Sequence, residues 1–327
     1  MKKGVLCLVL FLVASMVFAG GRRQEGAGPD GFPTRPITFL VGFGPGGPMD
    51  VTARAVIPTL ERLLGTTINV VNRPGANSWI AYEELARARP DGYTLAIFAV
   101  PGLFGFHDPR AGRTVNLDSF QLIGNVVTDP NSIIVRTGDT RFNTIQDVIN
   151  HARTTLTVVK YSGIGSDDDY TIKLVQRETG IRMQEVPSVA GWMEVLPALL
   201  GGHVDIAVSN VGESLNTERA GEVRTLVTFS AERTPFTPHV PTWNESGFGS
   251  EILMAAQRGF MMPAGGDPRL VRFLSDKLLE AMNTQEVIDN LYRLGMFPHP
   301  MSAEEVTADV RRQEAVAADM IELMFGN

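Results

Sequence analysis

Residues 42–50 combine glycine, proline and one acidic residue in a pattern that favours the binding of a small anion. Glycine stands at 42, 44, 46 and 47, and proline at 45 and 48. The apolar run Ile37–Val41 before them predicts a buried strand, and the apolar spacing of Met49–Leu64 predicts a helix. The first N–H groups of a helix have no internal acceptor and carry partial positive charge, and glycine lets a ligand approach the backbone closely. We therefore predict an anion site over Phe43–Asp50.

The same glycines spell G-x-G-x-x-G, the fingerprint of a dinucleotide site, but three features oppose that interpretation. Pro45 and Pro48 have no N–H group to offer a pyrophosphate. Asp50 places a negative charge beside the same loop. The next predicted strand ends in Asn72, where a ribose requires Asp or Glu. We expect no nucleotide and no other cofactor.

Catalytic and metal-binding chemistry finds little support in the sequence. No histidine lies at metal-ligand spacing from another His, Cys or Glu, and no G-x-S-x-G nucleophile motif occurs. The five histidines are His107, His151, His203, His239 and His299. A Ser-His-Asp triad built from distant residues stays open, because its members need not be neighbours in the chain. We expect a protein that is not an enzyme, with no catalytic residues and no metal.

The N-terminus has the pattern of a secretory signal peptide, which we assign to residues 1–20. Lys2 and Lys3 form a basic segment, Val5–Val13 an apolar one, and Val17-Phe18-Ala19 resembles a small-residue cleavage site. An uncleaved N-terminal anchor is the alternative. Cys7, the single cysteine, lies inside the apolar segment, too early for lipid attachment at the cleavage site. We therefore expect a periplasmic protein that is not a lipoprotein.

Length and charge limit the possible classes of partner. The chain has 327 residues, enough for about two domains with sizeable cores. Removal of the signal peptide leaves 27 basic and 36 acidic residues, a net charge of −9. This negative charge argues against nucleic acid and against an anionic membrane surface as partners. It would also repel an anionic ligand, so local dipoles would have to hold such a ligand. Residues 21–32 are polar and glycine-rich, and we expect a flexible leader there.

Predicted strands and helices alternate along the chain, which favours parallel βαβ units. Ligands of such sheets bind at the carboxyl ends of the strands, where helix N-termini converge. Three strand-to-helix junctions qualify, over residues 43–50, 75–79 and 162–169. The strands are expected at 37–41, 68–71, 93–100, 132–135, 156–161, 183–186, 204–208 and 226–229, and the helices at 49–64, 79–88, 144–153, 170–179, 192–200, 269–282 and 303–324.

An ordered set of short motifs resembles the substrate-binding proteins of tripartite tricarboxylate transporters, the Bug or TctC family. Each motif is weak alone, but their order is specific, and they extend from Phe32 to about Val306. The motifs are Arg35–Thr38, Gly44–Gly47, Asp50, Ala53-Arg54, Asn72–Ala76, Pro90–Leu95, Ser162–Ser166, Leu199–Asp205, Val240–Thr242, Glu245–Gly247 and Pro263–Gly266.

The resemblance implies an α/β fold, a two-domain periplasmic-binding-protein clamshell of type II-like architecture, each domain a mainly parallel sheet flanked by helices. It implies that the domains close over a small carboxylate, which is delivered to one large and one small membrane subunit. The family has no enzymatic activity and needs no cofactor. Its cleft is lined by loops that match Phe43–Gly47 and Ser162–Ser166 and by the segment that matches Ser209-Asn210. A binding protein that serves a signalling receptor has the same fold and stays an alternative, as does, less favoured, a secreted enzyme.

The sequence departs from the family at three places that bear on the ligand. Asn77, Ser78 and Trp79 stand where relatives usually have glycines, and Trp79 is equally expected as a pocket wall or as core. Asp167-Asp168-Asp169 replaces uncharged residues and a histidine; a solvated first helical turn is favoured over contact with a cationic ligand group. Ser188–Ala190 replaces a Tyr-Lys pair. We therefore expect a monocarboxylate, or a carboxylate with an apolar or amino-bearing tail.

Asp50 is favoured as a cap of its helix over a ligand contact. The first domain is expected to hold residues 33–130 and 255–327, and the second residues 131–254, in two sheets, with the chain crossing near 129–131 and 255–258 of a monomer. The expected ligand-binding residues are Phe43, Gly44, Pro45, Gly46, Gly47, Asp50, Ala76, Asn77, Trp79, Ser162, Gly165, Ser166, Asp167 and Asn210.

Overall fold

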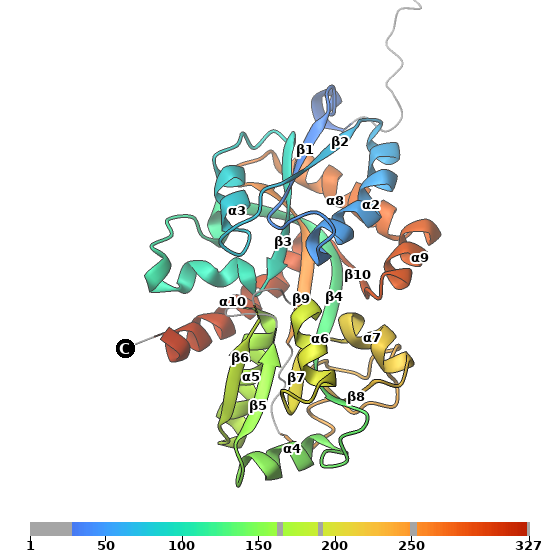
Figure 1. Ribbon diagram of the computed structural model, residues 1–327. Helices are drawn as coiled ribbons and strands as arrows, with labels where there is room; N and C mark the ends of the chain where they lie inside the picture. Colours follow the sequence, from blue (N-terminus) through green and yellow to red (C-terminus); the bar gives the residue numbers. More distant parts are fainter. Residues whose placement is uncertain (1–27, 162–165, 189–191, 249–253, 326–327) are drawn as a thin grey trace, which may run out of the picture.

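The computed structural model describes residues 28–161, 166–188, 192–248 and 254–325. These residues form two α/β halves, one above the other in Figure 1, which long strands connect. We call them the β1 half and the β5 half, after a parallel strand of each.

The β1 half contains the parallel strands β1, β2 and β3, with β1 in the centre. Five apolar or β-branched residues form β1, and four of them are buried, because helices cover this part of the sheet. The elements are β1 (Ile37–Val41), α2 (Pro48–Leu64), β2 (Ile68–Asn72), α3 (Trp79–Ala86), β3 (Thr94–Val100), α8 (Pro268–Met282), α9 (Gln285–Arg293), β10 (Pro298–Met301) and α10 (Ala303–Phe325). Short 3-10 helices lie at Pro29–Gly31, Gly102–His107, Pro109–Ala111 and Leu117–Ser119.

The β5 half repeats this arrangement with β5 between β6 and β7, both parallel to it. Helix α5 follows β5 and α7 follows β7, so two helices begin at the carboxyl ends of these strands. The elements are α4 (Ile145–Ala152), β5 (Thr157–Tyr161), α5 (Asp167–Thr179), β6 (Met183–Pro187), α6 (Trp192–Leu200), β7 (Ile206–Asn210), α7 (Val211–Arg219) and β8 (Val223–Thr228).

Two long strands, β4 (Phe120–Arg136) and β9 (Ala255–Pro263), run from one half to the other and pair with each other. The strand pairings form two sheets, as predicted, but the sheets are not separate. Strand β4 pairs with β9 and β10 in one and with β7 and β8 in the other, so the order β2-β1-β3-β9-β4-β7-β5-β6 is continuous. Segments that the sequence suggested as connections are themselves paired strands. The chain passes between the halves where β4 and β9 pair, at Pro130 opposite Ala255.

The sheet is mixed, which corrects the expectation of a mainly parallel sheet in each domain. Parallel pairing is confined to the outer strands, and every pair that involves β4 or β9 is antiparallel. Strands β4 and β9 run opposite to the neighbouring strands of the βαβ units, so they pair with those strands in antiparallel fashion. The domain limits at 130/131 and 254/255 stay a prediction.

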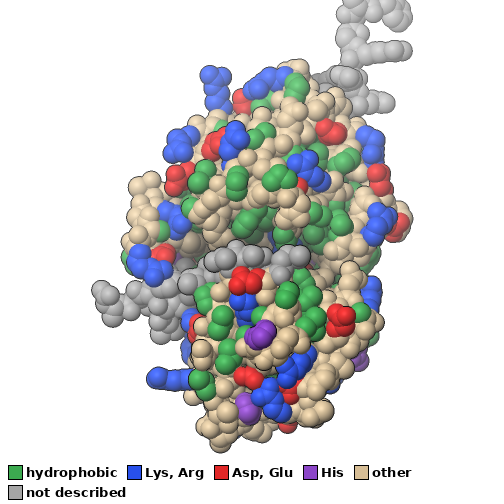
Figure 2. Space-filling model, viewed as in Figure 1, with side chains coloured by type: hydrophobic (Ala, Val, Ile, Leu, Met, Phe, Trp, Pro, Cys, Tyr) green, Lys and Arg blue, Asp and Glu red, His purple; other side chains and the backbone are tan. Residues whose placement is uncertain are grey.

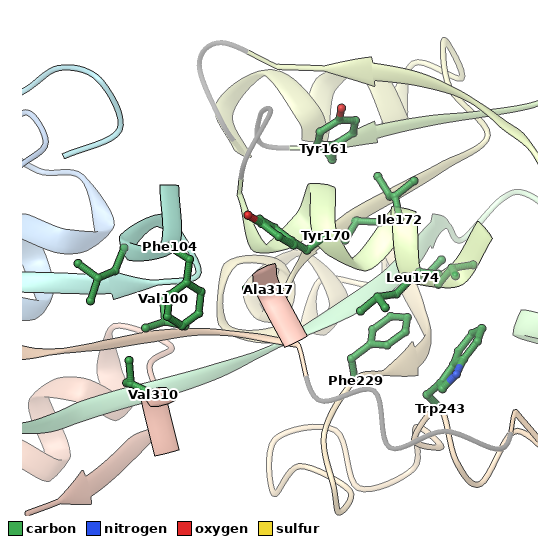
Figure 3. Close-up of a cluster of buried hydrophobic side chains, with 14 of the residues drawn as sticks. Val100, Phe104, Tyr161, Tyr170, Ile172, Leu174, Phe229, Trp243, Val310 and Ala317 are labelled. Carbon is green, nitrogen blue, oxygen red and sulfur yellow. The ribbon is translucent and has the colours of Figure 1, made fainter. Parts of the chain in front are cut away.

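The core is continuous between the two halves on the α10 side of the sheet. One cluster of buried side chains joins Val100 and Phe104 of the β1 half to Tyr170 and Phe229 of the β5 half. Figure 3 shows Ala317 of α10 between these two groups. A second cluster fills the space between the β1 half of the sheet and α2, α8 and α9, and a small third one lies beneath α6. Helix α10 therefore packs against both halves.

Candidate functional site

The glycine loop lies between the carboxyl end of β1 and the first turn of α2, as its sequence predicts. Gly47 is the N-cap of α2, with extended dihedral angles and no side-chain cap. Pro48 occupies the first helical position, where its missing N–H costs nothing. Gly46 has a φ of 80°, a left-handed conformation that favours glycine. The loop thus turns sharply into the helix without a side chain over the free helix end.

Asp50 anchors this loop from within α2. Its carboxylate accepts hydrogen bonds from the N–H of Gly46 (2.9 Å), from Nε of Arg54 (2.9 Å) and from Nδ2 of Asn72 (3.0 Å). Asn72 also donates to the carbonyl oxygen of Phe43 at 2.8 Å. Burial alone would raise the pKa of Asp50, but the bonds from Arg54, Gly46 and Asn72 outweigh it and lower that pKa. Asp50 therefore fixes the loop to α2 and β2, a different role from the capping of its helix that the sequence favoured.

Backbone donors remain available at the same turn. The N–H of Gly46 donates to Asp50, and that of Gly47 donates to the carbonyl oxygen of Gly44 at 3.3 Å. Among the described residues, the N–H groups of Gly44, Met49 and Asp50 find no protein acceptor. Nothing lies within 4 Å of where a Cβ on Gly44 would point. The turn thus presents donors with partial positive charge and open space beside Gly44, which suits a carboxylate.

The second predicted junction is strained. Ala76, Asn77 and Ser78 have φ values of 48°, 51° and 74°, and Gly75 has 131°. Each left-handed non-glycine residue costs roughly 1–2 kcal/mol, so the surrounding structure must enforce the turn. A Cβ on Gly42 would lie only 2.3 Å from Cβ of Ser78, which shows how closely the first two loops pack. Ala76 and Asn77 are exposed beside the glycine loop.

Trp79 packs as core, and this decides between its two predicted roles. Its side chain is 2% exposed, and its rings pack edge-on against Tyr82 and Phe106. The indole N–H donates to the carbonyl oxygen of Gly102 at 3.2 Å, and the guanidinium of Arg113 lies 4.5 Å from the ring centroid. Trp79 therefore packs in the core directly after the strained turn and does not form an exposed pocket wall.

The third predicted junction is described only from Ser166 onward, and Ser162 and Gly165 lie outside the described residues. Ser166 is the N-cap of α5, and its hydroxyl accepts the N–H of Asp169 at 3.3 Å. Asp168 and Asp169 are each 1% exposed, so the favoured interpretation of a solvated acidic turn is wrong. Side-chain amides of β4 and β7 donate hydrogen bonds to two of the three carboxylates. Nδ2 of Asn131 donates to Asp168, and Nδ2 of Asn210 to Asp167, each at 2.7 Å.

Two further carboxyl groups lie at this junction, the buried Asp129 and the partly buried Glu213, and sequence reasoning missed both. Asp129 of β4 is 2% exposed and accepts the N–H of Gly212, in the first turn of α7, at 3.0 Å. Burial raises the pKa of Asp129 to about 8, although the nearby positive charge of Arg258 acts to lower it. Burial likewise raises the pKa of Glu213 to about 7, and it raises the pKa of Asp167. At neutral pH Asp129 is therefore mostly protonated and Glu213 about half protonated.

Arg258 of β9 is the cation of this junction, and it too was missed. It is 6% exposed, and its positive charge acts on Asp129, Asp167 and Glu213. A signal was present in the sequence, since Arg258 is the one charged residue of 255–263, where every other residue except Gln257 is apolar or small. A charged residue inside a buried strand is rare unless it has a partner or a function.

The predicted site residues thus form two groups, one at each edge of the junction between the halves. Phe43–Gly47, Asp50, Ala76 and Asn77 belong to the β1 half, and Ser166, Asp167 and Asn210 to the β5 half. Figure 2 shows the surface recessed between the two halves. Among the described residues, no three His, Cys, Asp or Glu side chains are grouped as metal ligands, and no helix is long and apolar enough to cross a membrane.

Comparison with known proteins gives the chain a family. Residues 52–324 match the model of the tripartite tricarboxylate transporter family receptor, TctC. A protein encoded in the tcbD-tcbE intergenic region of a Pseudomonas species is 30% identical over 87% of this chain and 84% of its own length. Protein BugT of Bordetella pertussis is 29% identical over 82% of this chain and 83% of its own length.

Solved structures agree in fold. A TctC solute-binding protein from Polaromonas, without ligand, is 27% identical with a TM-score of 0.78 over 89% of this chain and 99% of its own. MatC of Rhodopseudomonas palustris, with bound malate, is 26% identical with a TM-score of 0.72 over 89% and 100%. An R. palustris protein with adipate is 25% identical with a TM-score of 0.75 over 90% and 98%. The chain belongs to the TctC receptor family of tripartite tricarboxylate transporters and has the fold of its periplasmic solute-binding proteins.

Proposed function

We propose that this protein captures a small carboxylate between its two halves and delivers it to the membrane subunits of a tripartite transporter. The observation that carries the proposal is the set of unsatisfied N–H groups at Gly44, Met49 and Asp50, in a turn held by the buried carboxylate of Asp50. A helix N-terminus preorganised in this way stabilises a carboxylate without requiring a net positive surface.

The β5 half supplies a second surface for the same ligand. Helices α5 and α7 begin at the carboxyl ends of β5 and β7, with Ser166 and Asn210 as their N-caps. A ligand that touches both halves is bound more tightly when they approach each other, which couples binding to closure. We propose the remaining predicted contacts, Phe43–Gly47, Ala76, Asn77, Ser162, Gly165, Ser166, Asp167 and Asn210, as the lining of this site.

The ligand class follows from the site and from the relatives. Similar proteins have been solved with malate and with adipate. Burial raises the pKa of Asp167, which weakens the repulsion that the sequence suggested for a carboxylate, and Asp168 is directed toward Asn131. This also weakens the argument that these residues select an amino-bearing ligand. We propose small aliphatic carboxylates as the first candidates.

The sequence pattern of residues 1–20 supports a role outside the cytoplasmic membrane. We propose that residues 1–20 direct export to the periplasm, where the mature chain acts as a monomer with the domain limits given above. Its partners would be one large and one small membrane subunit. Uptake of the identified acid by cells that lack this protein, compared with cells that express it, tests the transport step separately from binding.

Binding is tested by thermal unfolding and calorimetry of the mature protein with malate, adipate, citrate, hexanoate, glutamate and putrescine. A ligand at about 100 times its Kd stabilises the folded state by roughly 2.7 kcal/mol, which is readily detected. We expect stoichiometric binding of at least one aliphatic carboxylate without turnover. If none of the acids binds, or if an acid is chemically converted, the proposed function is wrong.

A further inference from the structure

Arg258 is a buried residue whose guanidinium makes no hydrogen bond to any residue that the structure describes. It is 6% exposed. Among the described residues, no carboxylate oxygen lies within 4.0 Å of its nitrogens, and none of its side-chain N–H groups donates a hydrogen bond to the protein. A guanidinium carries five N–H donors in a fixed fork, and leaving a buried charge unpaired is costly. Arg141, by contrast, pairs with Asp139 and Asp205.

The strand register places Arg258 at the centre of the junction. It lies opposite Ala99 of β3 and Val127 of β4. Ala96 of β3 is paired with Leu40 of β1, so Ala99, three residues further along, is level with Phe43, where the glycine loop begins. Two strand spacings, about 10 Å, separate this loop from the backbone of β9. From the β5 half, Asp167 of α5 and Glu213 of α7 are close enough for the charge of Arg258 to act on them.

We propose that Arg258 binds a carboxylate group of the ligand through its two-pronged guanidinium, between the glycine loop of the β1 half and the first turns of α5 and α7. This inference rests on the proposed function and specifies how the ligand is recognised. A planar guanidinium matches the two oxygens of a carboxylate, and such bidentate bonds are the strongest that arginine forms. Arg258 would thus supply the positive charge that the acidic surface of the protein lacks.

The buried acids around Arg258 favour a carboxylate over an amine as the ligand group. Asp129 and Asp167 already accept bonds from Gly212 and Asn210, and one oxygen of Glu213 is buried without a partner. Burial raises the pKa of Asp129 to about 8 and that of Glu213 to about 7, so below neutral pH these groups are uncharged. The imidazole of His299 in β10 is hydrogen-bonded to the hydroxyl of Thr128. In that state the charge of Arg258 is not neutralised, and the site attracts anions.

This arrangement makes ligand affinity depend on pH. As pH rises through 7 and 8, Glu213 and Asp129 lose protons, and their charges neutralise Arg258 and repel the ligand carboxylate. A bound carboxylate also raises the pKa of both acids, so binding takes up protons. The affinity of the wild-type protein should therefore fall between pH 6 and pH 9.

The experiment compares the Kd values of malate and adipate for the wild-type protein, Arg258→Gln, Arg258→Lys and the control Arg224→Gln. Arg224 is half-buried in β8, where it donates to the carbonyl oxygen of Asp139 at 3.3 Å, away from the junction. We expect Arg258→Gln to weaken binding at least tenfold, Arg258→Lys to weaken it less, and Arg224→Gln to leave it unchanged. The double variant Asp129→Asn/Glu213→Gln should bind at pH 9 as tightly as the wild type binds at pH 6.

The possible outcomes separate this inference from the proposed function. If the wild-type protein binds an acid and Arg258→Gln binds it equally well, only the role of Arg258 is refuted. If no acid binds, both proposals fail. If putrescine binds and Arg258→Gln strengthens that binding, the acids select an amine and the inference is wrong. Should Arg258→Gln not fold, the Kd of Arg258→Lys decides, because lysine keeps the charge but loses the two-pronged bond, and an unchanged Kd in a folded Arg258→Lys would refute the role of Arg258.

Discussion

At the scale of single residues, the same residue type has different roles according to its partners. Asp50 is held ionised by Arg54, Asn72 and a backbone N–H, and it fixes a loop. Asp129 is just as buried but accepts a bond from Gly212, and its pKa rises to about 8. The difference is set by the donors around each carboxylate, because burial alone would raise both pKa values.

The glycine loop allows a test in which function and stability separate. Gly44 has no positive φ and no atom within 4 Å of a prospective Cβ, so we expect Gly44→Val to fold normally. Its side chain would occupy the space beside the free N–H groups, and we expect at least a tenfold loss of affinity for the bound acid by calorimetry. Gly46→Val should also lose roughly 1–2 kcal/mol of stability, because Gly46 has a φ of 80°.

Gly138 provides the matched control for Gly44. It lies in an exposed turn of the β5 half, equally without neighbours within 4 Å and without a positive φ. Gly138→Val should change neither the unfolding midpoint nor the affinity. Unchanged affinity in Gly44→Val would show that the ligand binds elsewhere.

At the scale of elements, α7 depends on a residue of a different strand for its N-terminal turn. Its N-cap, Asn210, makes no side-chain bond to the helix, and Asp129 of β4 accepts the N–H of Gly212 instead. The carboxyl group of Asp129 thus links the crossing strand to a helix of the β5 half, and a neutral acceptor suffices for this bond.

Asp129→Asn is expected to stabilise the protein at high pH. In the unfolded chain Asp129 ionises near pH 4, but in the folded protein only near pH 8, so the unfolded state binds fewer protons between these values. The wild-type protein therefore loses up to roughly 1.4 kcal/mol of stability per pH unit over this window, and the variant does not.

The measurement is the free energy of unfolding in urea at pH 4, 6 and 8. The advantage of Asp129→Asn over the wild type should be absent at pH 4 and largest at pH 8, since asparagine keeps the oxygen that accepts the N–H of Gly212. A variant that is less stable at pH 8 would mean that the carboxylate is ionised in the folded protein.

At the scale of the whole molecule, the two halves touch through backbone as well as through β4 and β9. Gly212 of α7 and Gly295, between α9 and β10, approach so closely that a Cβ on Gly212 would lie 1.9 Å from the carbonyl oxygen of Gly295. The same Cβ would lie 2.7 Å from Oδ2 of Asp129. This contact sets how near α7 can come to the β1 half.

Gly212→Ala should therefore push the halves apart. In an ordinary helix the change to alanine stabilises by roughly 1 kcal/mol, but here it places a methyl group against backbone that cannot yield without a shift. We expect lower thermal stability, a changed small-angle scattering profile and weaker ligand binding. Gly138→Ala should show none of these effects, and an unchanged scattering profile in Gly212→Ala would contradict a rigid contact.

The local elements and the first anion loop were accessible from the sequence, because short-range patterns determine them. The glycine loop, β1 and α2 were predicted within one residue, since strand and helix periodicity and the proline and glycine positions all agree there. The ordered motifs also identified the family correctly, and the family model matches residues 52–324.

Only the tertiary structure decided which side chains meet at the junction. The sequence did not show that residues 120–136 and 255–263 form long paired strands, because their pattern of burial depends on neighbours from both halves. It could not show that Asp168 turns toward Asn131, or that Arg258 lies among Asp129, Asp167 and Glu213. Burial and charge interactions depend on distances in space between residues far apart in the chain, and local patterns contain no information about those distances.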